Sequence, residues 1–177
     1  MLKRVFQLLG LFLVAFLIFS CEKSGSGKGS DKFKVDPEPI IQDAMKNKKF
    51  LFIVFESADC KYCNKLNKEV LNNLDFKQKV IKNKGAVAII NVYGQREVTD
   101  PETGKKMTEE ALALAYRVQG YPTIVVFEPK EDGKMKILYV IPGYIPKEDF
   151  EGLLEYLSSG CYKKIKYPEF IKKGKSC

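Results

Sequence analysis

The amino-acid sequence has 177 residues and contains neither histidine nor tryptophan. The absence of histidine excludes a Ser-His or Cys-His catalytic pair and haem attachment through a CxxCH motif. It also removes the imidazole ligands that zinc and copper sites usually use. Apolar residues make up 45% of the chain and charged residues 29%, a balance that predicts one soluble domain with a hydrophobic core and additional terminal segments.

The N-terminus has the pattern of an export signal. Lys3 and Arg4 precede a run, residues 5–19, that contains one Gln and no charged residue. A membrane-spanning helix needs about 20 apolar residues, so this run is typical of the core of a secretory signal. It ends in "LIFSC", which resembles the bacterial lipoprotein signal, where a small residue precedes the cysteine that becomes the lipidated first residue. The alternative is an uncleaved anchor helix in which Cys21 is incidental.

This resemblance divides the N-terminal region into a signal peptide, residues 1–20, and a flexible tether, residues 21–35, rich in Gly, Ser and Lys. It implies lipidation of Cys21 and a position on the periplasmic or cell-surface side of a bacterial membrane, held there by the lipid anchor. Disulfides persist outside the cytoplasm, and four cysteines remain to form them. Lys and Arg exceed Asp and Glu by 30 to 22. The basic residues are scattered without an aromatic-basic cluster, so no nucleic-acid partner is expected.

Hydrophobic periodicity predicts alternating helices and strands over residues 36–160. The predicted helices cover residues 36–49, 60–84 with a break near 72–75, 108–120 and 145–160, and the predicted strands cover residues 50–56, 85–93, 121–129 and 135–143. The central strand–helix–strand unit implies a parallel crossover, and the last two strands form a hairpin. We therefore expect an α/β domain with a mixed four-stranded sheet and helices on both faces. A polar loop, 94–107, and a basic C-terminal tail, 161–177, complete the prediction.

The stretch "FESADCKYCNKL" places Cys60 and Cys63 between a predicted buried strand and a predicted helix. Sites in α/β sheets favour the carboxyl ends of strands. A helix N-terminus stabilises a thiolate, which is the nucleophilic form of cysteine. Two cysteines separated by two residues at a helix start can form and break a disulfide. We expect Cys60, the more exposed of the two, to attack and Cys63 to resolve the mixed disulfide.

Three stretches, "FIVFESADCKYC", "VQGYPTIVVFE" and "IPG", resemble the thioredoxin superfamily over residues 36–158. The sequence is most similar to the exported thioredoxin-like branch, which includes the thioredoxin-like proteins of bacterial sulfur-oxidation systems and relatives of disulfide-interchange proteins. The resemblance implies a thioredoxin-like fold and dithiol/disulfide exchange with protein or small-molecule thiols and disulfides. It also implies a membrane-bound or soluble electron donor, and neither a dissociable cofactor nor a metal.

The resemblance also gives the segment "GYPT" a role. In this family the proline follows a cis peptide bond and packs beside the CxxC motif, which implies a cis bond between Tyr121 and Pro122. The free backbone of Tyr121 can then pair with an extended substrate segment. On spacing alone, an ordinary trans proline at a strand start is the alternative. Tyr62, between the two cysteines, is expected to offer an apolar face to partners, or else to be an exposed side chain without a role.

The surroundings of the cysteine pair depart from cytoplasmic thioredoxins. Those proteins carry a buried aspartate six positions before the first cysteine, where this sequence has Val54, and a tryptophan where it has Asp59. Proton transfer from Cys63 then needs another group, and Glu56 at the strand end is the candidate proton relay. The alternative for Glu56 is a solvated carboxylate.

The remaining cysteines, Cys161 and Cys177, flank a lysine-rich segment after the last predicted helix. A structural disulfide that fixes the C-terminal tail is the preferred interpretation, since closing a loop of this size is worth about 3 kcal/mol. A second redox pair that relays electrons to the CxxC motif, and a free or intermolecular Cys177, are the alternatives. A zinc site built from all four cysteines is disfavoured because such sites usually contain two close pairs.

These expectations describe an extracytoplasmic thiol–disulfide oxidoreductase, with reduction of partner disulfides preferred on the family analogy alone. Isomerisation and oxidation are the alternative directions. The rival from another class is a membrane-tethered binding module without enzymatic activity, which would keep the fold and a permanently oxidised cysteine pair.

Overall fold

The computed structural model describes residues 31–177, so the expected signal peptide, the lipidation site Cys21 and most of the tether lie outside the described residues. The described helices are η1 (Asp31–Phe33), α1 (Pro37–Lys46), α2 (Lys61–Leu66), the π-helix η2 (Asn67–Leu71), α3 (Leu74–Lys82), α4 (Glu109–Ala115), α5 (Lys147–Ser158), η3 (Cys161–Lys163) and α6 (Tyr167–Lys172). The strands are β1 (Phe50–Glu56), β2 (Gly85–Asn91), β3 (Glu97–Thr99), β4 (Lys106–Thr108), β5 (Thr123–Pro129) and β6 (Met135–Pro142). None of these helices is long and apolar enough to cross a membrane.

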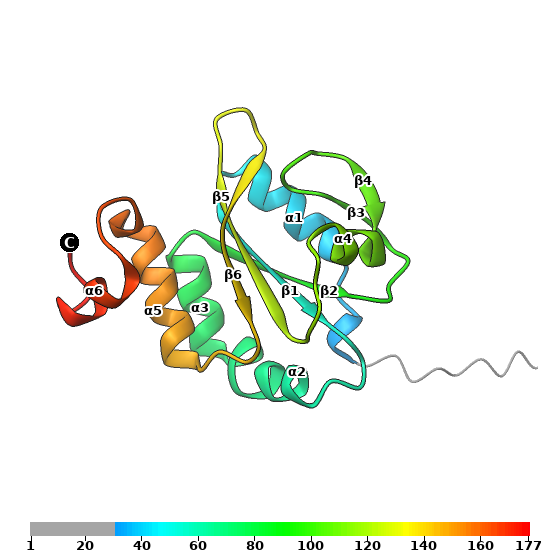
Figure 1. The fold of residues 1–177 in the computed structure, drawn as a ribbon, viewed down its shortest axis with the longest axis horizontal. Coiled ribbons are helices and arrows are strands. Elements are labelled where there is room, and N and C mark those ends of the chain that lie inside the picture. Colours follow the sequence, from blue (N-terminus) through cyan, green and yellow to red (C-terminus); the bar gives the residue numbers. More distant parts are fainter. Residues whose placement is uncertain (1–30) are drawn as a thin grey trace, which may run out of the picture.

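The four longer strands form one sheet in the order β2-β1-β5-β6 (Figure 1). β1 pairs with β2 in parallel and with β5 antiparallel, and β5 and β6 form an antiparallel hairpin. This topology confirms the predicted mixed four-stranded sheet. The carboxyl ends of β1 and β2 share one edge of the sheet, and β5 begins at the same edge because Thr123 lies opposite Phe55.

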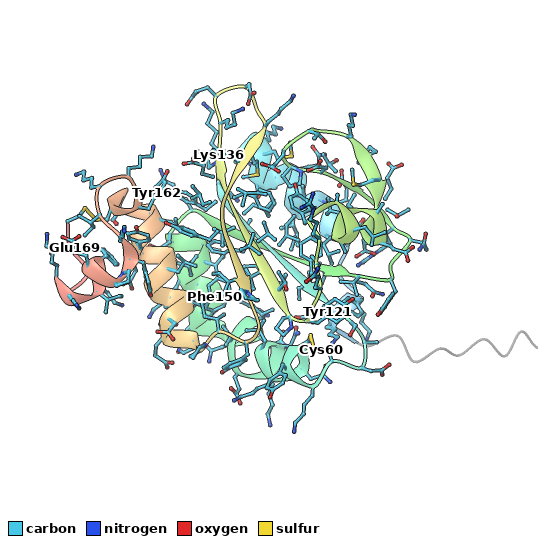
Figure 2. The ribbon with its side chains drawn as sticks, viewed as in Figure 1. Cys60, Tyr121, Lys136, Phe150, Tyr162 and Glu169 are labelled. Atoms are coloured by element: carbon cyan, nitrogen blue, oxygen red, sulfur yellow. A yellow bond between two sulfur atoms is a disulfide. The ribbon has the colours of Figure 1, made fainter. Side chains whose placement is uncertain are left out.

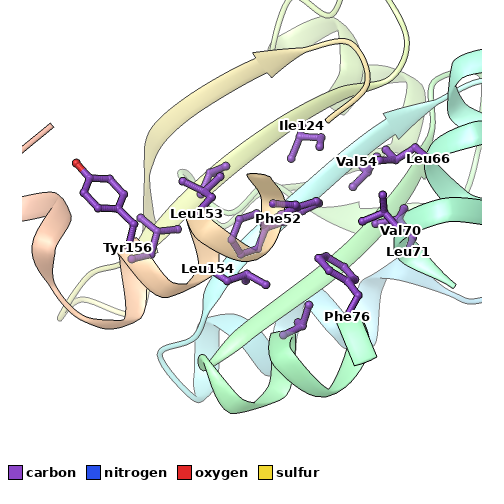
Figure 3. Packing of buried hydrophobic residues seen from close by; sticks show 14 of the residues in the cluster. Phe52, Val54, Leu66, Val70, Leu71, Phe76, Ile124, Leu153, Leu154 and Tyr156 are labelled. Atoms are coloured by element: carbon purple, nitrogen blue, oxygen red, sulfur yellow. The ribbon is translucent and has the colours of Figure 1, made fainter. Parts of the chain in front are cut away.

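Helices cover both faces of the sheet (Figure 1), and the side chains of β1 alternate between the two. Leu51 and Ile53 belong to the core beneath α1 and α4. Phe52 and Val54 belong to the core beneath α2, α3 and α5 (Figure 3). All four side chains are fully buried. Glu56, two residues beyond Val54, therefore continues the face of the strand that α2 covers.

Side-chain caps set the starts of α1, α3 and α4. Asp36 accepts the Glu38 N–H at 3.0 Å and starts α1, and Thr108 caps α4, both as predicted. The long helix predicted over 60–84 is divided into α2, η2 and α3. The break between η2 and α3 falls in the predicted region, because the Asn73 side chain accepts the Phe76 N–H and starts a new helix there. Apolar periodicity did not reveal the π-helix, which differs from an α-helix only in its hydrogen-bond register.

Two expectations for residues 94–120 are wrong. The predicted polar loop contains the small antiparallel sheet of β3 and β4, whose three-residue strands are too short to show an alternating pattern. The helix predicted to run to Gly120 ends at Ala115. Arg117 adopts a left-handed conformation with φ 53°, and the Tyr116 hydroxyl donates to Asp100 at 2.5 Å. The chain therefore leaves the helix before it reaches the glycine.

The segment 161–177, expected as a basic tail, carries η3 and α6 and packs against α5 (Figure 1). Phe170 of α6 is almost completely buried. Its ring centroid lies 5.1 Å from that of Tyr156 on α5. The abundant lysines conceal this in the sequence, because the apolar residues that pack on the core are scattered among them.

Two further contacts hold α6 in place. Cys161 and Cys177 form a disulfide that encloses the whole segment. The two helices also approach closely at Gly152 of α5, where a Cβ atom would lie 2.6 Å from the Tyr167 hydroxyl oxygen. The absence of a side chain at Gly152 therefore leaves room for the end of the Tyr167 ring.

Candidate active site

The two cysteines of the CxxC motif form a disulfide at the junction between β1 and α2, with their Sγ atoms 2.10 Å apart. Cys60 is the N-cap residue of α2, and its Sγ accepts a hydrogen bond from the Cys63 backbone N–H at 3.0 Å. Cys63 is fully buried, whereas Cys60 is partly exposed. An N–H group that points at the Cys60 sulfur also stabilises negative charge on it, so this geometry favours a thiolate when the pair is reduced.

The peptide bond between Tyr121 and Pro122 is cis, which confirms the expectation for this bond. Pro122 is buried and directly precedes β5. Because Thr123 lies opposite Phe55, the cis bond is located at the edge of the sheet from which the chain leads to Cys60. Figure 2 shows Tyr121 and Cys60 at this common end of the molecule.

Exposed aromatic side chains lie near this edge. Tyr62, between the cysteines, is 61% exposed, and Tyr93, which follows β2, is 65% exposed. The ring centroids of Tyr93 and Tyr121 are 6.4 Å apart, and a hydrogen bond with Tyr93 raises the pKa of Tyr121. Sequence reasoning selected Tyr62 and Tyr121 but missed Tyr93. Its position just after the second parallel strand, at the same sheet edge as the cysteines, is a signal that could have identified it.

Glu56 is completely buried at the end of β1, so the alternative of a solvated carboxylate is wrong. The Asn67 side-chain amide donates to both carboxylate oxygens at 2.8 Å, and its Nδ2 also donates to the Cys63 carbonyl oxygen at 2.9 Å. The Lys32 Nζ lies 3.5 Å from Glu56 Oε2. Burial raises the pKa of Glu56 from its ordinary value of 4.5 to about 6, although the Lys32 ammonium and the Asn67 amide act in the opposite direction.

The strand geometry places the carboxylate at position 56 on the same face of β1 as the side chain at position 54. Side chains two residues apart point to the same face of a strand, so Glu56 and Val54 both face α2. Val54 packs into the hydrophobic core, and the carboxylate lies two residues nearer to the cysteines. Lys32 and Asn67 were not found from the sequence. They reach Glu56 through tertiary contacts, and Lys32 lies in a segment with the composition of a linker.

The four cysteines of the described residues form two separate disulfides, Cys60–Cys63 and Cys161–Cys177. The second pair joins η3 to Cys177, beyond α6. α6 lies on the side of α5 that is away from α2 (Figure 1). The four cysteines therefore do not gather into the zinc site that the sequence allowed. Within residues 31–177, no group of three or more His, Cys, Asp or Glu side chains is placed to hold a metal ion.

Comparison with known proteins identifies the family. A model of the thioredoxin-like domain matches residues 38–158, and the chain therefore belongs to the thioredoxin-like family. A thioredoxin-fold protein from Helicobacter pylori is similar, with 33% identity over 72% of this chain and 80% of that chain and a TM-score of 0.54. A thioredoxin from Thermus thermophilus shares the fold at 24% identity over 70% of this chain and 86% of that chain, with a TM-score of 0.53. No curated protein matches the chain.

Family and site agree in the type of chemistry. A thioredoxin-like domain with a CxxC pair in disulfide contact is consistent with a thiol–disulfide oxidoreductase. Proteins with this fold exchange disulfides with protein thiol partners. In such exchange a thiolate attacks a disulfide sulfur and a mixed disulfide forms, so the two cysteines themselves carry the electrons.

Proposed function

We propose that the protein is an extracytoplasmic disulfide reductase that acts on disulfides of proteins or small thiol compounds. The environment of Cys60 carries this proposal. The residue is partly exposed, its Sγ accepts the Cys63 N–H, and it lies at the sheet edge that also holds the cis Tyr121–Pro122 bond. An accessible sulfur and a stabilised thiolate are what a dithiol needs to attack a partner disulfide. A free backbone segment at Tyr121 offers that partner an edge on which to dock.

In the proposed reaction the Cys60 thiolate attacks one sulfur of the partner disulfide. The partner's sulfur–sulfur bond breaks, its second sulfur leaves as a thiolate, and a mixed disulfide forms on Cys60. The Cys63 thiol then loses its proton and attacks the Cys60 sulfur, which releases the first partner sulfur as a thiolate and closes the Cys60–Cys63 disulfide. Two electrons pass from the dithiol to the partner, and a membrane-bound or soluble electron donor must restore the dithiol.

Glu56 is the proposed acceptor of the Cys63 proton. It is buried beside the helix that carries Cys63 and is linked to the Cys63 carbonyl through the Asn67 amide. Burial raises the pKa of Glu56 to about 6, so the carboxylate is ionised at neutral pH. Because this pKa lies close to pH 7, the group can also exchange protons efficiently. The resolving step should therefore slow as the pH falls through this value, because a protonated Glu56 cannot accept another proton.

Two residues are proposed to shape the docking of partners. The backbone of Tyr121, next to the cis bond, would pair with an extended segment of the partner. Tyr62, largely exposed between the cysteines, would offer its ring to apolar side chains of that segment. Buried apolar contact with an aromatic ring is a common source of binding energy at such sites.

The proposed location is the periplasmic or cell-surface side of a bacterial membrane, with a lipid on Cys21. The lipoprotein-like pattern at the N-terminus supports this location, and so does the Cys161–Cys177 pair, because structural disulfides persist in oxidising compartments. Loss of membrane partitioning in Cys21→Ser is the expected result. Unchanged partitioning together with an intact N-terminus would instead identify an uncleaved anchor.

Insulin reduction tests the enzymatic function. Wild-type protein with dithiothreitol is expected to accelerate precipitation of the insulin B chain, and Cys60→Ser is expected to match the uncatalysed rate. Equal behaviour of the two proteins would favour the non-enzymatic binding module. The midpoint potential of the Cys60–Cys63 couple then separates the directions. A reductase should lie near the thioredoxin value of about −270 mV, and an oxidase near the DsbA value of about −120 mV.

A further inference from the structure

Residues 31–35, called the lead segment here, make specific contacts with the candidate active site. Lys32 is the central residue, with a side chain only 5% exposed. Its Nζ donates to the Ser57 carbonyl oxygen at 2.7 Å and to Asn64 Oδ1 at 3.0 Å, and it lies 3.5 Å from Glu56 Oε2. One ammonium group thus joins the buried carboxylate, the loop that leads to Cys60 and the helix that follows it.

A second cation fixes the lead segment from the other side. Arg96 donates to the Phe33 carbonyl oxygen at 3.1 Å and to the Val35 carbonyl oxygen at 2.9 Å. The same guanidinium donates to both oxygens of Glu109, which is 1% exposed, at 2.9 and 2.7 Å. Arg96 belongs to the region expected as a polar loop, and through these bonds that region holds the lead segment. The lead segment is therefore held at two points. The Arg96 bonds help to position Lys32 in addition to its ion pair with Glu56.

Lys32 lies outside residues 38–158, the part of the chain that matches the family. Among the described residues, it is the one charged group that affects the pKa of Glu56, and the other contact, Asn67, is neutral. The titratable thiols of the reduced pair lie on the adjoining helix start. A buried carboxylate with a single counter-ion depends strongly on that counter-ion, because no other charge or bulk solvent compensates for its loss.

We propose that Lys32 is a positioning residue for the dithiol chemistry, which keeps Glu56 ionised at neutral pH and holds the loop before Cys60 in place. The proposal rests on the proposed role of Glu56 as acceptor of the Cys63 proton. Its consequence is that docking of the lead segment, which joins the domain to the residues before it, is coupled to the rate at which the mixed disulfide is resolved.

The direct test is a titration of Glu56 by carbon-13 NMR in the full-length oxidised protein. Lys32→Met keeps the length of the side chain and removes its charge, so the pKa of Glu56 should rise, by about one to three units for a lost neighbouring charge. Lys32→Arg should restore a value close to that of the wild type. Lys82→Met, which removes an exposed lysine at the end of α3, is the matched control and should leave the titration unchanged.

The functional readout is the pH dependence of insulin reduction. In Lys32→Met the acid limb of the profile should move to higher pH by the same amount as the Glu56 titration, with about a fivefold loss of rate at pH 6 if the limb moves by one pH unit. An unchanged Glu56 titration in a folded Lys32→Met protein would overturn the proposal. Failure of insulin reduction by wild-type protein would contradict the proposed function. It would leave the coupling between Lys32 and Glu56 testable, since the NMR titration needs no activity.

A second variant covers the case in which Lys32→Met folds but is too unstable for the titration. If loss of the counter-ion leaves a buried charge uncompensated, Lys32→Met combined with Glu56→Gln should recover the melting temperature of Glu56→Gln alone. Such recovery would support the coupling between the two residues. A double variant that melts as low as Lys32→Met would show that Lys32 acts through packing alone, and it would overturn the proposal.

Discussion

The Asn67 side-chain amide donates to both carboxylate oxygens of Glu56 and to the carbonyl oxygen of Cys63. Asn67 is the first residue of the π-helix η2, directly after α2. π-Helical turns often occur at functional sites, and here the turn follows the helix that carries the resolving cysteine. The single amide therefore connects the buried charge of β1 to the backbone of the redox pair.

The raised pKa of Glu56 predicts how stability depends on pH. The pKa in the folded protein, about 6, lies above the ordinary value of 4.5, so between these values the folded state binds more protons than the unfolded state. Stability should therefore fall as the pH rises through this window. Ionised Glu56 costs about 2 kcal/mol at pH 7, and Glu56→Gln should be more stable than wild type by about that amount.

Urea unfolding of the oxidised protein at pH 4 and pH 7 measures this effect. The stability difference between wild type and Glu56→Gln should be present at pH 7 and should largely vanish at pH 4. Glu148→Gln, which changes an exposed carboxylate of α5, should show no such dependence. Equal stabilisation by Glu56→Gln at both pH values would contradict the assigned titration.

The elements that the sequence predicts well are those whose signal is local. β1 is an uninterrupted apolar run, and its burial on both faces follows from that pattern. Asp36 and Thr108 start helices by the same short-range hydrogen bonds that make them recognisable in the sequence. The cysteine spacing and the segment at Pro122 carry the family resemblance, and the resemblance in turn indicated the cis bond.

The contacts that the sequence did not reveal join residues far apart along the chain. Lys32 and Glu56 are 24 positions apart, and the lysine lies in a segment of linker-like composition. Phe170 lies in a lysine-rich segment, yet its buried side chain joins α6 to the core. No periodicity marks either residue, because each contributes through tertiary contacts with residues far from it in the sequence. Folding of the whole chain, and not local preference, determines these positions.

The disulfide between Cys161 and Cys177 is predicted to stabilise the C-terminal segment without taking part in electron transfer. The bond closes a loop with a sequence separation of 16, and removal of both cysteines by alanine substitution should cost about 3 kcal/mol in urea unfolding. Insulin reduction should keep the wild-type rate, because this pair lies away from α2. A folded double variant without insulin-reducing activity would instead make the pair part of the electron path.

The close approach of α5 and α6 predicts a destabilising effect of Gly152→Ala. The added Cβ would lie 2.6 Å from the Tyr167 hydroxyl oxygen, and that hydroxyl also donates to the Asp149 carbonyl oxygen at 3.1 Å. Overpacking of this kind typically costs about 2 kcal/mol, which exceeds the gain of up to about 1 kcal/mol in helix propensity.

Tyr167→Phe provides the matched control because it removes the hydroxyl that the new Cβ would meet. Urea unfolding of the two single variants and the double variant gives the coupling between the positions. Gly152→Ala should be less destabilising in the Tyr167→Phe background than in wild type. Equal costs in the two backgrounds would mean that the contact between these side chains does not limit the approach of α6.

Tyr93 is predicted to contribute to the docking of protein substrates, although it is not part of the CxxC motif or of the segment around Pro122. Its ring is 65% exposed and lies 6.4 Å from that of Tyr121, so it extends the surface next to the cis bond. Tyr93→Ala should raise the KM for insulin about fivefold, which corresponds to about 1 kcal/mol for an aromatic contact.

Reduction of a small aromatic disulfide by Tyr93→Ala should be unaffected, since such a substrate reaches only the Cys60 sulfur. Leu114→Ala, which removes a side chain 73% exposed on α4, is the control, and an equal effect of both variants on KM would assign the loss to general surface changes.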